Sequence, residues 1–243
     1  NTHGVTHTMT IATLLLIFLL GFLIGSIPNA YLVTLAVKRI NIFEVGSGNM
    51  GGTNVARTLG LHWGIFTAAL DALKGILAVV VAQWFVPATL AFSPTMATGL
   101  GEALLIPSIV GAVGAVTGHN WSLFATLLYS YYNDTFEIRG GKGAATAFGS
   151  MLMILPLVGP VVLLAVGIPV ALITRFASLA VLVSFSVCFI WSIVWALTTD
   201  LVSNYYLIYV GLLAILIVWR FRENIERLAS GTERRLGDRV QTS

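Results

Sequence analysis

A glycine-rich polar segment, residues 46–54, has the composition of an anion-binding loop. It reads GSGNMGGTN, and Arg57 follows it closely. Successive backbone N–H groups in such a loop form a concave nest for an anion, and Arg57 adds a permanent charge on a planar fork of donors. The polar groups and glycines of this nest are Gly46, Ser47, Gly48, Asn49, Gly51, Gly52, Thr53 and Asn54. We therefore expect phosphate or carboxylate to bind here. A flexible interhelical loop is the alternative, and it would leave the asparagine, threonine and arginine side chains unexplained.

A second glycine-rich segment, residues 139–143, reads RGGKG and precedes an apolar run that begins with AAT. A helix that starts after a glycine loop offers free N–H groups and the positive end of its dipole to an anion. Lys142 would reach an anion bound at that point. We therefore expect this segment to form another part of an anion site, with Gly140, Gly141, Gly143 and Thr146 around Lys142.

Three ionisable residues near these segments are open to two interpretations. His119 precedes the second segment, and a lone histidine is more often structural, although one beside an anion could donate a hydrogen bond or a proton. Asp71 and Lys74 lie three residues apart inside an apolar run, on one face of a helix. Ionisable groups at membrane depth usually face a polar interior. The two residues therefore form either a structural ion pair or part of a site.

Several common functional motifs are excluded by their spacing or surroundings. Residues 46–51 fit the dinucleotide pattern G-x-G-x-x-G, but no strand–helix unit surrounds them, and residues 139–146 lack the spacing of a P-loop. The sequence has no G-x-S-x-G nucleophile elbow. A single cysteine, Cys188, excludes an intrachain disulfide and a cysteine-rich metal site. Carboxylates are also too sparse in these loops for a two-metal site, so we expect no metal ion. We likewise expect no cofactor and no nucleic-acid partner.

The composition is that of an integral membrane protein. Hydrophobic residues make up 57% and charged residues 9%, with a mean hydropathy of +0.92, whereas soluble domains carry about 25% charged residues. We expect one all-α transmembrane domain, residues 1–243, with seven spans, since a crossing needs roughly 20 apolar residues. The expected spans are residues 11–37, 62–86, 103–117, 144–155, 157–174, 179–198 and 205–219, followed by a tail at 220–243. Polar residues and Pro28 interrupt the first span, which is tolerated where the freed backbone faces protein or a polar cavity.

The positions of the basic residues predict an orientation in the membrane. If seven spans alternate, twelve of the thirteen Lys and Arg residues lie on one side, and Lys74 lies within a span. The positive-inside rule then puts the C-terminus in the cytoplasm and the N-terminus outside. Both glycine-rich segments face the cytoplasm in this arrangement, so they could converge on one ligand.

Several motifs follow one another along the chain: GSGNMGGTNVAR at 46–57, DALKG at 71–75, GH at 118–119, GGKGAAT at 140–146, RFASL at 175–179, RENIERL at 222–228 and GTE at 231–233. In this order they resemble the bacterial acyl-phosphate:glycerol-3-phosphate acyltransferase family, PlsY. The resemblance implies a seven-span enzyme of the bacterial inner membrane with a cytoplasmic active site. It implies transfer of a fatty acyl group from acyl phosphate to the 1-hydroxyl of glycerol 3-phosphate, giving lysophosphatidic acid and phosphate, without acyl-CoA or acyl carrier protein. This is the first step of phospholipid synthesis.

The resemblance also implies roles for individual residues. The implied catalytic set is Ser47, Asn49, Thr53, Arg57 and Lys142. The implied substrate-binding set is Gly46, Gly48, Gly51, Gly52, Asn54, His119, Gly140, Gly141, Gly143, Thr146, Arg175, Ser178, Arg222 and Asn224. We expect Arg57, Lys142, Ser178 and Asn224 to hold the glycerol phosphate, and residues 46–53 to receive the acyl phosphate head. The acyl chain is expected in a groove open to membrane lipid, and an upstream enzyme that forms acyl phosphate is the expected partner.

Three features depart from the family pattern. Phe221 stands where the family usually has histidine, and Gly52 stands where the first motif more often has alanine. Residues 125–138 also form a longer segment than the family leads us to expect. Two other classes stay open, a transporter of a phosphate-bearing solute and a non-catalytic phospholipid-binding protein. Acyl phosphate is an activated mixed anhydride that needs no enzyme nucleophile, so fixed donors and alignment could supply most of the catalysis. We expect a phosphate oxygen of the substrate to take the hydroxyl proton, with His119 structural.

Overall fold

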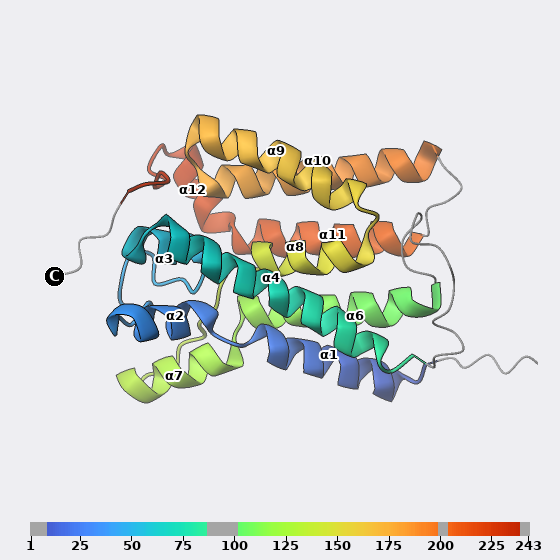
Figure 1. Ribbon diagram of the computed structural model, residues 1–243, viewed down its shortest axis with the longest axis horizontal. Coiled ribbons are helices and arrows are strands. Elements are labelled where there is room, and N and C mark those ends of the chain that lie inside the picture. Colours follow the sequence, from blue (N-terminus) through green and yellow to red (C-terminus); the bar gives the residue numbers. More distant parts are fainter. Residues whose placement is uncertain (1–8, 87–101, 199–203, 239–243) are drawn as a thin grey trace, which may run out of the picture.

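The computed structural model describes residues 9–86, 102–198 and 204–238, and every regular element within these ranges is an α-helix. The all-α prediction is therefore confirmed for this part of the chain. The N-terminal tail and most of the loops expected at 87–102 and 200–204 lie outside it. The helices, shown in Figure 1, are α1 (Ile11–Gly25), α2 (Asn29–Lys38), α3 (Gly52–Leu59), α4 (Leu61–Gln83), α6 (Glu102–Asn120), α7 (Leu123–Asn133), α8 (Ala144–Ile154), α9 (Val158–Thr174), α10 (Ala177–Thr198), α11 (Asn204–Arg220) and α12 (Arg222–Ala229).

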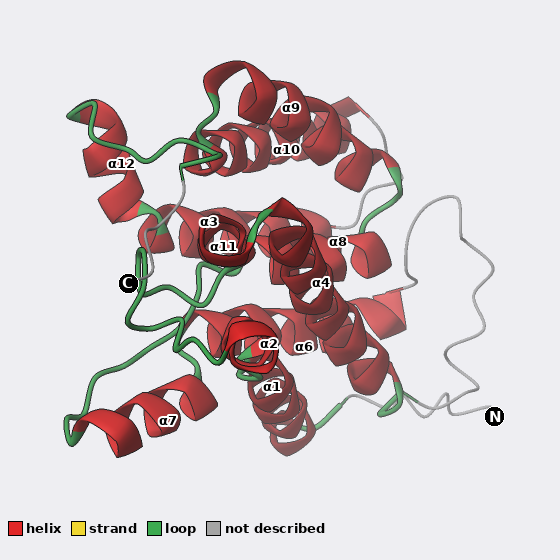
Figure 2. Ribbon diagram, turned by 60° about the vertical axis from the view of Figure 1, so that its left-hand side comes forward, coloured by secondary structure: helices red, strands yellow, loops and turns green. Residues whose placement is uncertain are grey.

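The long helices stack in three layers, which Figures 1 and 2 show from two directions. The helices α9 and α10 form one outer layer, α4, α8 and α11 lie in the middle, and α1 and α6 form the other outer layer. Shorter elements, α2, α3, α7 and α12, gather at one end of the stack (Figure 1). The main buried core lies among α6, α8, α10 and α11 and includes Leu105, Met151, Phe185, Tyr209 and Leu213.

Glycines allow neighbouring helices to pack with their backbones in contact. A Cβ on Gly25 of α1 would collide with the backbone of Ala115 on α6, and a Cβ on Gly75 of α4 would collide with the carbonyl oxygen of Thr146 on α8. Membrane helices commonly pack through small residues, because van der Waals contact between close backbones contributes where the hydrophobic effect does not. The second contact sets the start of α8 directly against α4.

The interruption in the first expected span is a break between α1 and α2. Lys74 Nζ donates to the carbonyl oxygens of Gly25 at 3.0 Å and Ile27 at 2.9 Å, which the end of α1 leaves without helical partners. Ser122, in the break between α6 and α7, donates its hydroxyl to the Ser26 carbonyl at 2.6 Å. The freed backbone groups therefore bond to protein, which confirms the expectation for this interruption.

Four helical stretches of the described chain are long and apolar enough to cross a membrane, namely Ile11–Lys38, Leu61–Gln83, Ala103–Asn133 and Ala177–Thr198. The pair α11 and α12, bent by 59°, is a fifth candidate. The helices α8 and α9 are apolar but shorter, with 11 and 17 residues. These elements are those of a multi-pass membrane protein, whereas the count of seven spans stays a prediction.

Three short helices lie where the sequence predicts loop or tail. The helix α3 begins inside the glycine-rich segment 46–54, and α12 forms the start of the expected tail. We expected a polar loop before the second glycine-rich segment. This prediction is wrong for residues 123–133, which form α7. Ser122 Oγ accepts the Ala125 N–H at 3.0 Å as an N-cap, and the helix buries Ala125 but exposes Tyr131. The helix α6 continues to Asn120, beyond the end of the third expected span.

Candidate active site

A cavity of about 400 Å³ brings the two glycine-rich segments together. Its walls come from α3, α4, α6, α8, α10 and α12, from the segments before α3 and α8, and from residues just before and after α12. The predicted site residues that line it are Gly46, Ser47, Asn49, Gly51, Gly52, Thr53, Asn54, Arg57, His119, Lys142, Gly143, Ser178 and Asn224. Segments that are far apart in the sequence therefore face one space, and the roles of these residues stay predictions.

Asn54 organises the first glycine-rich segment. Its Oδ1 accepts the Ser47 N–H at 3.1 Å, and its Nδ2 donates to the carbonyl oxygens of Val45 and Asn49, each at 3.1 Å. The chain turns at Gly46, whose φ of 64° lies in the left-handed region that glycine adopts without strain. The Asn54 side chain is thus committed to the shape of the loop. Ser47 and Asn49 line the cavity together with Asn54.

The guanidinium group of Arg57, on α3, places a positive charge at the cavity. One terminal nitrogen donates to the carbonyl oxygen of Arg234 at 3.1 Å, and Nε is buried with no hydrogen-bond partner among the described residues. Burial, and then the charge of Arg234, lowers the pKa of Arg57, but a guanidinium stays protonated near neutral pH. An unpaired buried donor is costly, so Arg57 is suited to an anionic ligand.

The second glycine-rich segment is held from behind by α6 and α11. Arg220 donates twice to the Gly141 carbonyl oxygen, from Nε at 3.0 Å and from a terminal nitrogen at 2.7 Å. The Gly141 N–H donates to the His119 carbonyl oxygen at 2.8 Å. Gly143, with a φ of 74°, then starts α8. These bonds fix the loop so that Lys142 reaches the cavity.

Lys142 is a cation that titrates close to neutral pH. Its Nζ donates to Asn224 Oδ1 and lies 5.0 Å from the ring centre of Phe221. Burial, and then the charge of Arg227, lowers the pKa of Lys142 to about 8. The Phe221 ring attracts a cation to its face but can neither donate nor accept a proton. Lys142 is therefore charged at neutral pH and loses its charge in mildly alkaline solution.

Glu233 ties together two side chains of the predicted phosphate site and one that the sequence did not predict. Its Oε1 accepts from Ser178 Oγ at 2.9 Å and Asn224 Nδ2 at 2.8 Å, and its Oε2 accepts from Arg227 Nε at 2.9 Å. Burial alone would raise the pKa of Glu233, but these hydrogen bonds and the charge of Arg227 lower it. Ser178 and Asn224, two of the four side chains expected to hold the glycerol phosphate, are thus engaged with a protein carboxylate. Their contact with substrate stays a prediction.

Sequence reasoning missed four charged residues that line the cavity, Glu223, Arg227, Glu233 and Arg234. The available signals were the motifs at 222–228 and 231–233. In the first, Glu223 and Arg227 are four residues apart and so share one helical face. Glu233 carried no chemical signal, because an acid beside an anion site would be expected to repel the substrate. Its role becomes clear only in the structure, where the side chains of Ser178 and Arg227 donate hydrogen bonds to its carboxylate.

Six predicted site residues lie outside the cavity lining, namely Gly48, Gly140, Gly141, Thr146, Arg175 and Arg222. Arg175 donates twice to the Leu236 carbonyl oxygen, at 2.7 and 3.2 Å, and so holds the tail. Arg222 is exposed beside the Trp219 ring. Thr146 is fully buried in α8. Any direct contact of these residues with substrate stays a prediction.

Asp71, Lys74 and His119 form a buried polar centre beside the cavity. Lys74 Nζ lies 3.0 Å from Asp71 Oδ1 and 3.0 Å from His119 Nδ1. Asn29 Nδ2 donates to Asp71 Oδ1 at 3.1 Å. Asp71 and His119 line the cavity, whereas Lys74 lies behind them. The two interpretations of Asp71 and Lys74 are thus compatible, since the residues form an ion pair and one of them borders the cavity.

Comparison with known proteins gives a consistent result. The chain matches the family described as glycerol-3-phosphate acyltransferase over residues 15–231. A glycerol-3-phosphate acyltransferase of Thermus thermophilus is 36% identical over 230 residues, which cover 92% of this chain and 95% of that protein. That of Thermoanaerobacter pseudethanolicus is 33% identical, covering 92% and 96%. The crystal structure of PlsY, an integral membrane glycerol 3-phosphate acyltransferase, in its glycerol 3-phosphate form has a TM-score of 0.70 and 28% identity, covering 93% and 96%.

Proposed function

We propose that this chain, which belongs to the glycerol-3-phosphate acyltransferase family, transfers a fatty acyl group from acyl phosphate to the 1-hydroxyl of glycerol 3-phosphate. The products are lysophosphatidic acid and inorganic phosphate. Membership of this family supports acyl transfer with glycerol 3-phosphate as the acceptor. We propose acyl phosphate as the acyl donor in addition.

One observation carries this proposal: two glycine-rich segments and two cations, Arg57 and Lys142, converge on one cavity. Both proposed substrates carry a phosphate group, so the site must hold two clusters of negative charge. Fixed N–H groups and cations stabilise charge that develops in a transition state. Holding both substrates in one space supplies the alignment that a bimolecular reaction otherwise lacks.

The proposed reaction needs no covalent enzyme intermediate. The 1-hydroxyl oxygen attacks the acyl carbon, a new ester C–O bond forms, and the C–O bond to phosphate breaks with its electrons leaving on inorganic phosphate. The hydroxyl proton passes to a phosphate oxygen of the substrate, whose second pKa lies near about 6, as in a phosphorylated side chain. Arg57 and Lys142 stabilise the negative charge on the phosphates during this exchange.

We assign the acyl chain to the apolar wall of the cavity. Small side chains make up this wall, namely Ala68 on α4, Ala144 and Ala145 on α8, and Ala177 and Val181 on α10. Small residues leave room for an alkyl chain beside the polar loops. A chain in this position would run between helices towards the membrane lipid.

We also propose that the protein lies in the bacterial inner membrane with the cavity open to the cytoplasm. Support comes from α2, α3 and α12, which carry Lys38, Arg57 and Arg227 and gather at one end of the stack (Figure 1). Basic residues are concentrated on the cytoplasmic side of membrane proteins. An upstream enzyme that forms acyl phosphate would supply the donor at this face.

The proposal is tested with purified protein, acyl phosphate and labelled glycerol 3-phosphate, with lysophosphatidic acid as the readout. We expect product with acyl phosphate and none with acyl-CoA. Arg57→Ala and Lys142→Ala should each lower kcat/KM for glycerol 3-phosphate by about tenfold to about a hundredfold, because each removes charge-assisted hydrogen bonds of about 1.5–3 kcal/mol.

Lys38→Ala is the matched control, since Lys38 is an exposed cation at the end of α2 and does not line the cavity. It should retain wild-type kinetics. Wild-type kinetics in folded Arg57→Ala and Lys142→Ala would remove both residues from the site. Uptake of glycerol 3-phosphate into vesicles without product would instead identify a transporter, and lipid binding without product or uptake would identify a binding protein.

A further inference from the structure

Arg139 belongs to one glycine-rich segment and lies beside the other. It is the first residue of the second segment, three positions before Lys142. A Cβ placed on Gly48, in the first segment, would lie 3.6 Å from a terminal nitrogen of Arg139. Ser47 and Asn49, the two neighbours of Gly48, line the cavity, whereas Arg139 and Gly48 lie outside its lining. The two segments therefore meet through Arg139 at a point outside the cavity.

The backbone of Arg139 is fixed at the start of α7. Its N–H donates to Thr126 Oγ1 at 3.0 Å, and its carbonyl oxygen accepts the Ser122 N–H at 2.9 Å. Ser122 is the N-cap of α7, and Thr126 lies in the first turns of this helix. The Arg139 side chain thus extends from a backbone that α7 holds in place.

The main partner of the Arg139 guanidinium is the ring of Tyr129, on α7. The guanidinium carbon lies 3.8 Å from the ring centre, and a cation within about 6 Å of an aromatic face is attracted to it. A terminal nitrogen also donates to Glu137 at 2.8 Å, but the Glu137 side chain is 55% exposed, and exposed ion pairs contribute little. Nε is buried with no hydrogen-bond partner among the described residues. Stacking on Tyr129 therefore holds the group more than hydrogen bonds do.

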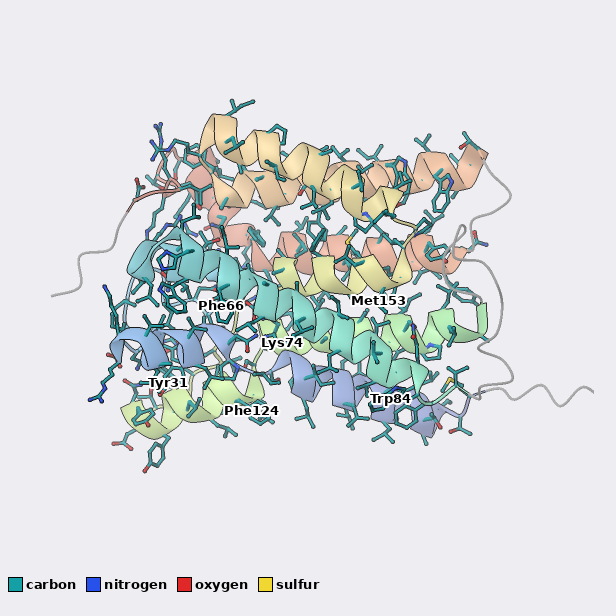
Figure 3. The ribbon with its side chains drawn as sticks, viewed as in Figure 1. Tyr31, Phe66, Lys74, Trp84, Phe124 and Met153 are labelled. Carbon is teal, nitrogen blue, oxygen red and sulfur yellow. The ribbon has the colours of Figure 1, made fainter. Side chains whose placement is uncertain are left out.

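An aromatic and apolar cluster joins Tyr129 to the first glycine-rich segment. The Tyr129 ring meets Phe43 edge to face, with centres 6.0 Å apart, and Phe43 stacks on Tyr31 at 5.6 Å. Figure 3 shows Tyr31 at the end of the stack where α2 and α7 lie. Met50 of the first segment is fully buried in the same cluster, and the Phe43 carbonyl oxygen would lie 3.0 Å from a Cβ on Gly48. The helix α7 thus packs against the first segment and at the same time holds Arg139.

We propose that Arg139, stacked on Tyr129, is a positioning residue that fixes the first glycine-rich segment relative to Lys142. This inference rests on the proposed function and deepens it, because two substrates held by two segments react only when the segments are aligned. It also assigns a role to the long segment 125–138, which supplies Tyr129.

Substitution of Arg139 should impair alignment more than binding. We expect Arg139→Ala to lower kcat by about tenfold to about a hundredfold, since a displacement of about 1 Å between reacting groups can cost that much. Each segment keeps its own donors, so kcat and kcat/KM for each substrate should fall equally. Arg139→Lys should be impaired as well, because an ammonium group does not stack as the planar guanidinium does. A raised KM with unchanged kcat, or wild-type kinetics in both folded variants, would overturn the proposal.

Two substitutions of Tyr129 test the stacking itself. Tyr129→Phe keeps the ring face and should retain wild-type kcat, whereas Tyr129→Leu should be impaired like Arg139→Ala. The double variant Arg139→Ala with Tyr129→Leu should have a kcat no lower than the weaker of the two single variants, because residues that act through one contact are not additive. Reductions that multiply in the double variant would show that the two residues act independently, against the proposal.

Two exposed residues of the same region provide matched controls. Glu137→Gln removes the ion pair of Arg139 but leaves the stacking, and Tyr131→Leu removes a ring that is 79% exposed on α7. Both variants should show wild-type kinetics. A loss in Glu137→Gln equal to that in Arg139→Ala would assign the effect to the ion pair and overturn the role of Tyr129.

Hydrogen–deuterium exchange in lipid nanodiscs tests the positioning without activity. The Ser47 N–H donates to Asn54 Oδ1 at 3.1 Å and the Gly48 N–H to the Val45 carbonyl oxygen at 3.0 Å. In Arg139→Ala these amides should lose protection, whereas those of α9 and α10 should keep it. Unchanged protection of the first segment, or an equal loss throughout the protein, would overturn the proposal.

Arg139→Lys and Tyr129→Leu allow the same measurements should Arg139→Ala fail to fold. A wild-type protein that transfers no acyl group would defeat the proposed function. The exchange experiment would still decide whether Arg139 fixes the first glycine-rich segment.

Discussion

Lys142 is a cavity residue whose charge responds to mildly alkaline pH. Burial, and then the charge of Arg227, lowers its pKa to about 8. Because the ammonium form binds phosphate, kcat/KM for glycerol 3-phosphate should be highest below this pKa and fall as pH rises through it. We expect a fall of about tenfold to about a hundredfold, the value of one hydrogen bond to a charged group. A pH profile of kcat/KM is the measurement, since this ratio reports the free enzyme.

Lys142→Arg is the matched variant for this prediction, because a guanidinium keeps its charge throughout the same pH range. It should lose the alkaline decline even if its kcat is lower. If the decline persists unchanged in Lys142→Arg, the titrating group is another residue.

Residue types and spacing predict only part of what these side chains do. Arg57 and Lys142 were recognisable, because a cation beside glycines indicates an anion site, and both line the cavity. Asn54 has the same appearance in the sequence, yet its polar atoms bond to the loop backbone. Glu233 could not be predicted, since its three partners are brought together only by the fold. Sequence shows what a side chain can bond to, whereas its partner depends on distant segments.

The contact between α4 and α8 sets the distance between the two halves of the site. A Cβ on Gly75 would meet the Thr146 carbonyl oxygen of α8, so Gly75→Ala should force the helices apart and shift Lys142 relative to Arg57. Overpacking of this kind costs about 1–3 kcal/mol. We expect a lower unfolding temperature in detergent together with a lower kcat in the acyl transfer assay.

Gly211→Ala provides the matched control for Gly75→Ala. Gly211 also lies within a helix, α11, but a Cβ there would meet only the Phe189 ring, at an ordinary contact distance of 3.6 Å. Glycine in a helix interior costs about 1 kcal/mol relative to alanine, so this substitution should be neutral or stabilising. If both variants behaved alike, the close approach of α4 and α8 would have no special role.

At the scale of elements, the long helices were easier to predict than the short ones. A long apolar run in a membrane has few alternatives to a helix, because its backbone groups must bond to each other. The break in the first run was likewise predictable from Ser26, Pro28 and Asn29. The helices α3 and α7 were not, since α3 opens with glycine and α7 depends on the Ser122 cap and on burial of one face.

The arrangement in the membrane is testable without activity. A cysteine at Ser230, which is exposed after α12, should react with an impermeant thiol reagent only after the cells are permeabilised. A cysteine at Ser93, which lies outside the described residues, should react from the outer side of intact cells. The native Cys188 is buried and should contribute little background. The opposite labelling pattern would reverse the orientation that the charge distribution predicts.

For the whole molecule, the charge pattern predicted that segments 46–57 and 140–146 face one side, and the structure brings them to one cavity. Charge alone could not predict which helices lie between them. That depends on contacts such as Gly25 with Ala115 and Gly75 with Thr146, which the sequence records only as glycines in apolar runs. The layer order therefore needed the structure.

The segment that follows α12 determines at which point of synthesis this site can be completed. It supplies the Glu233 carboxylate, the Arg234 carbonyl oxygen that bonds to Arg57 and the Leu236 carbonyl oxygen that bonds to Arg175. Chains are synthesised from the N-terminus and begin to fold during synthesis, so α3 and α4 exist long before these groups do. A nascent chain that ends at Ser230 already contains Arg57, Lys142 and Arg227, but it lacks Arg234 and the Glu233 carboxylate that links α10 to α12. The site can therefore be completed only after the segment that follows α12 has been synthesised.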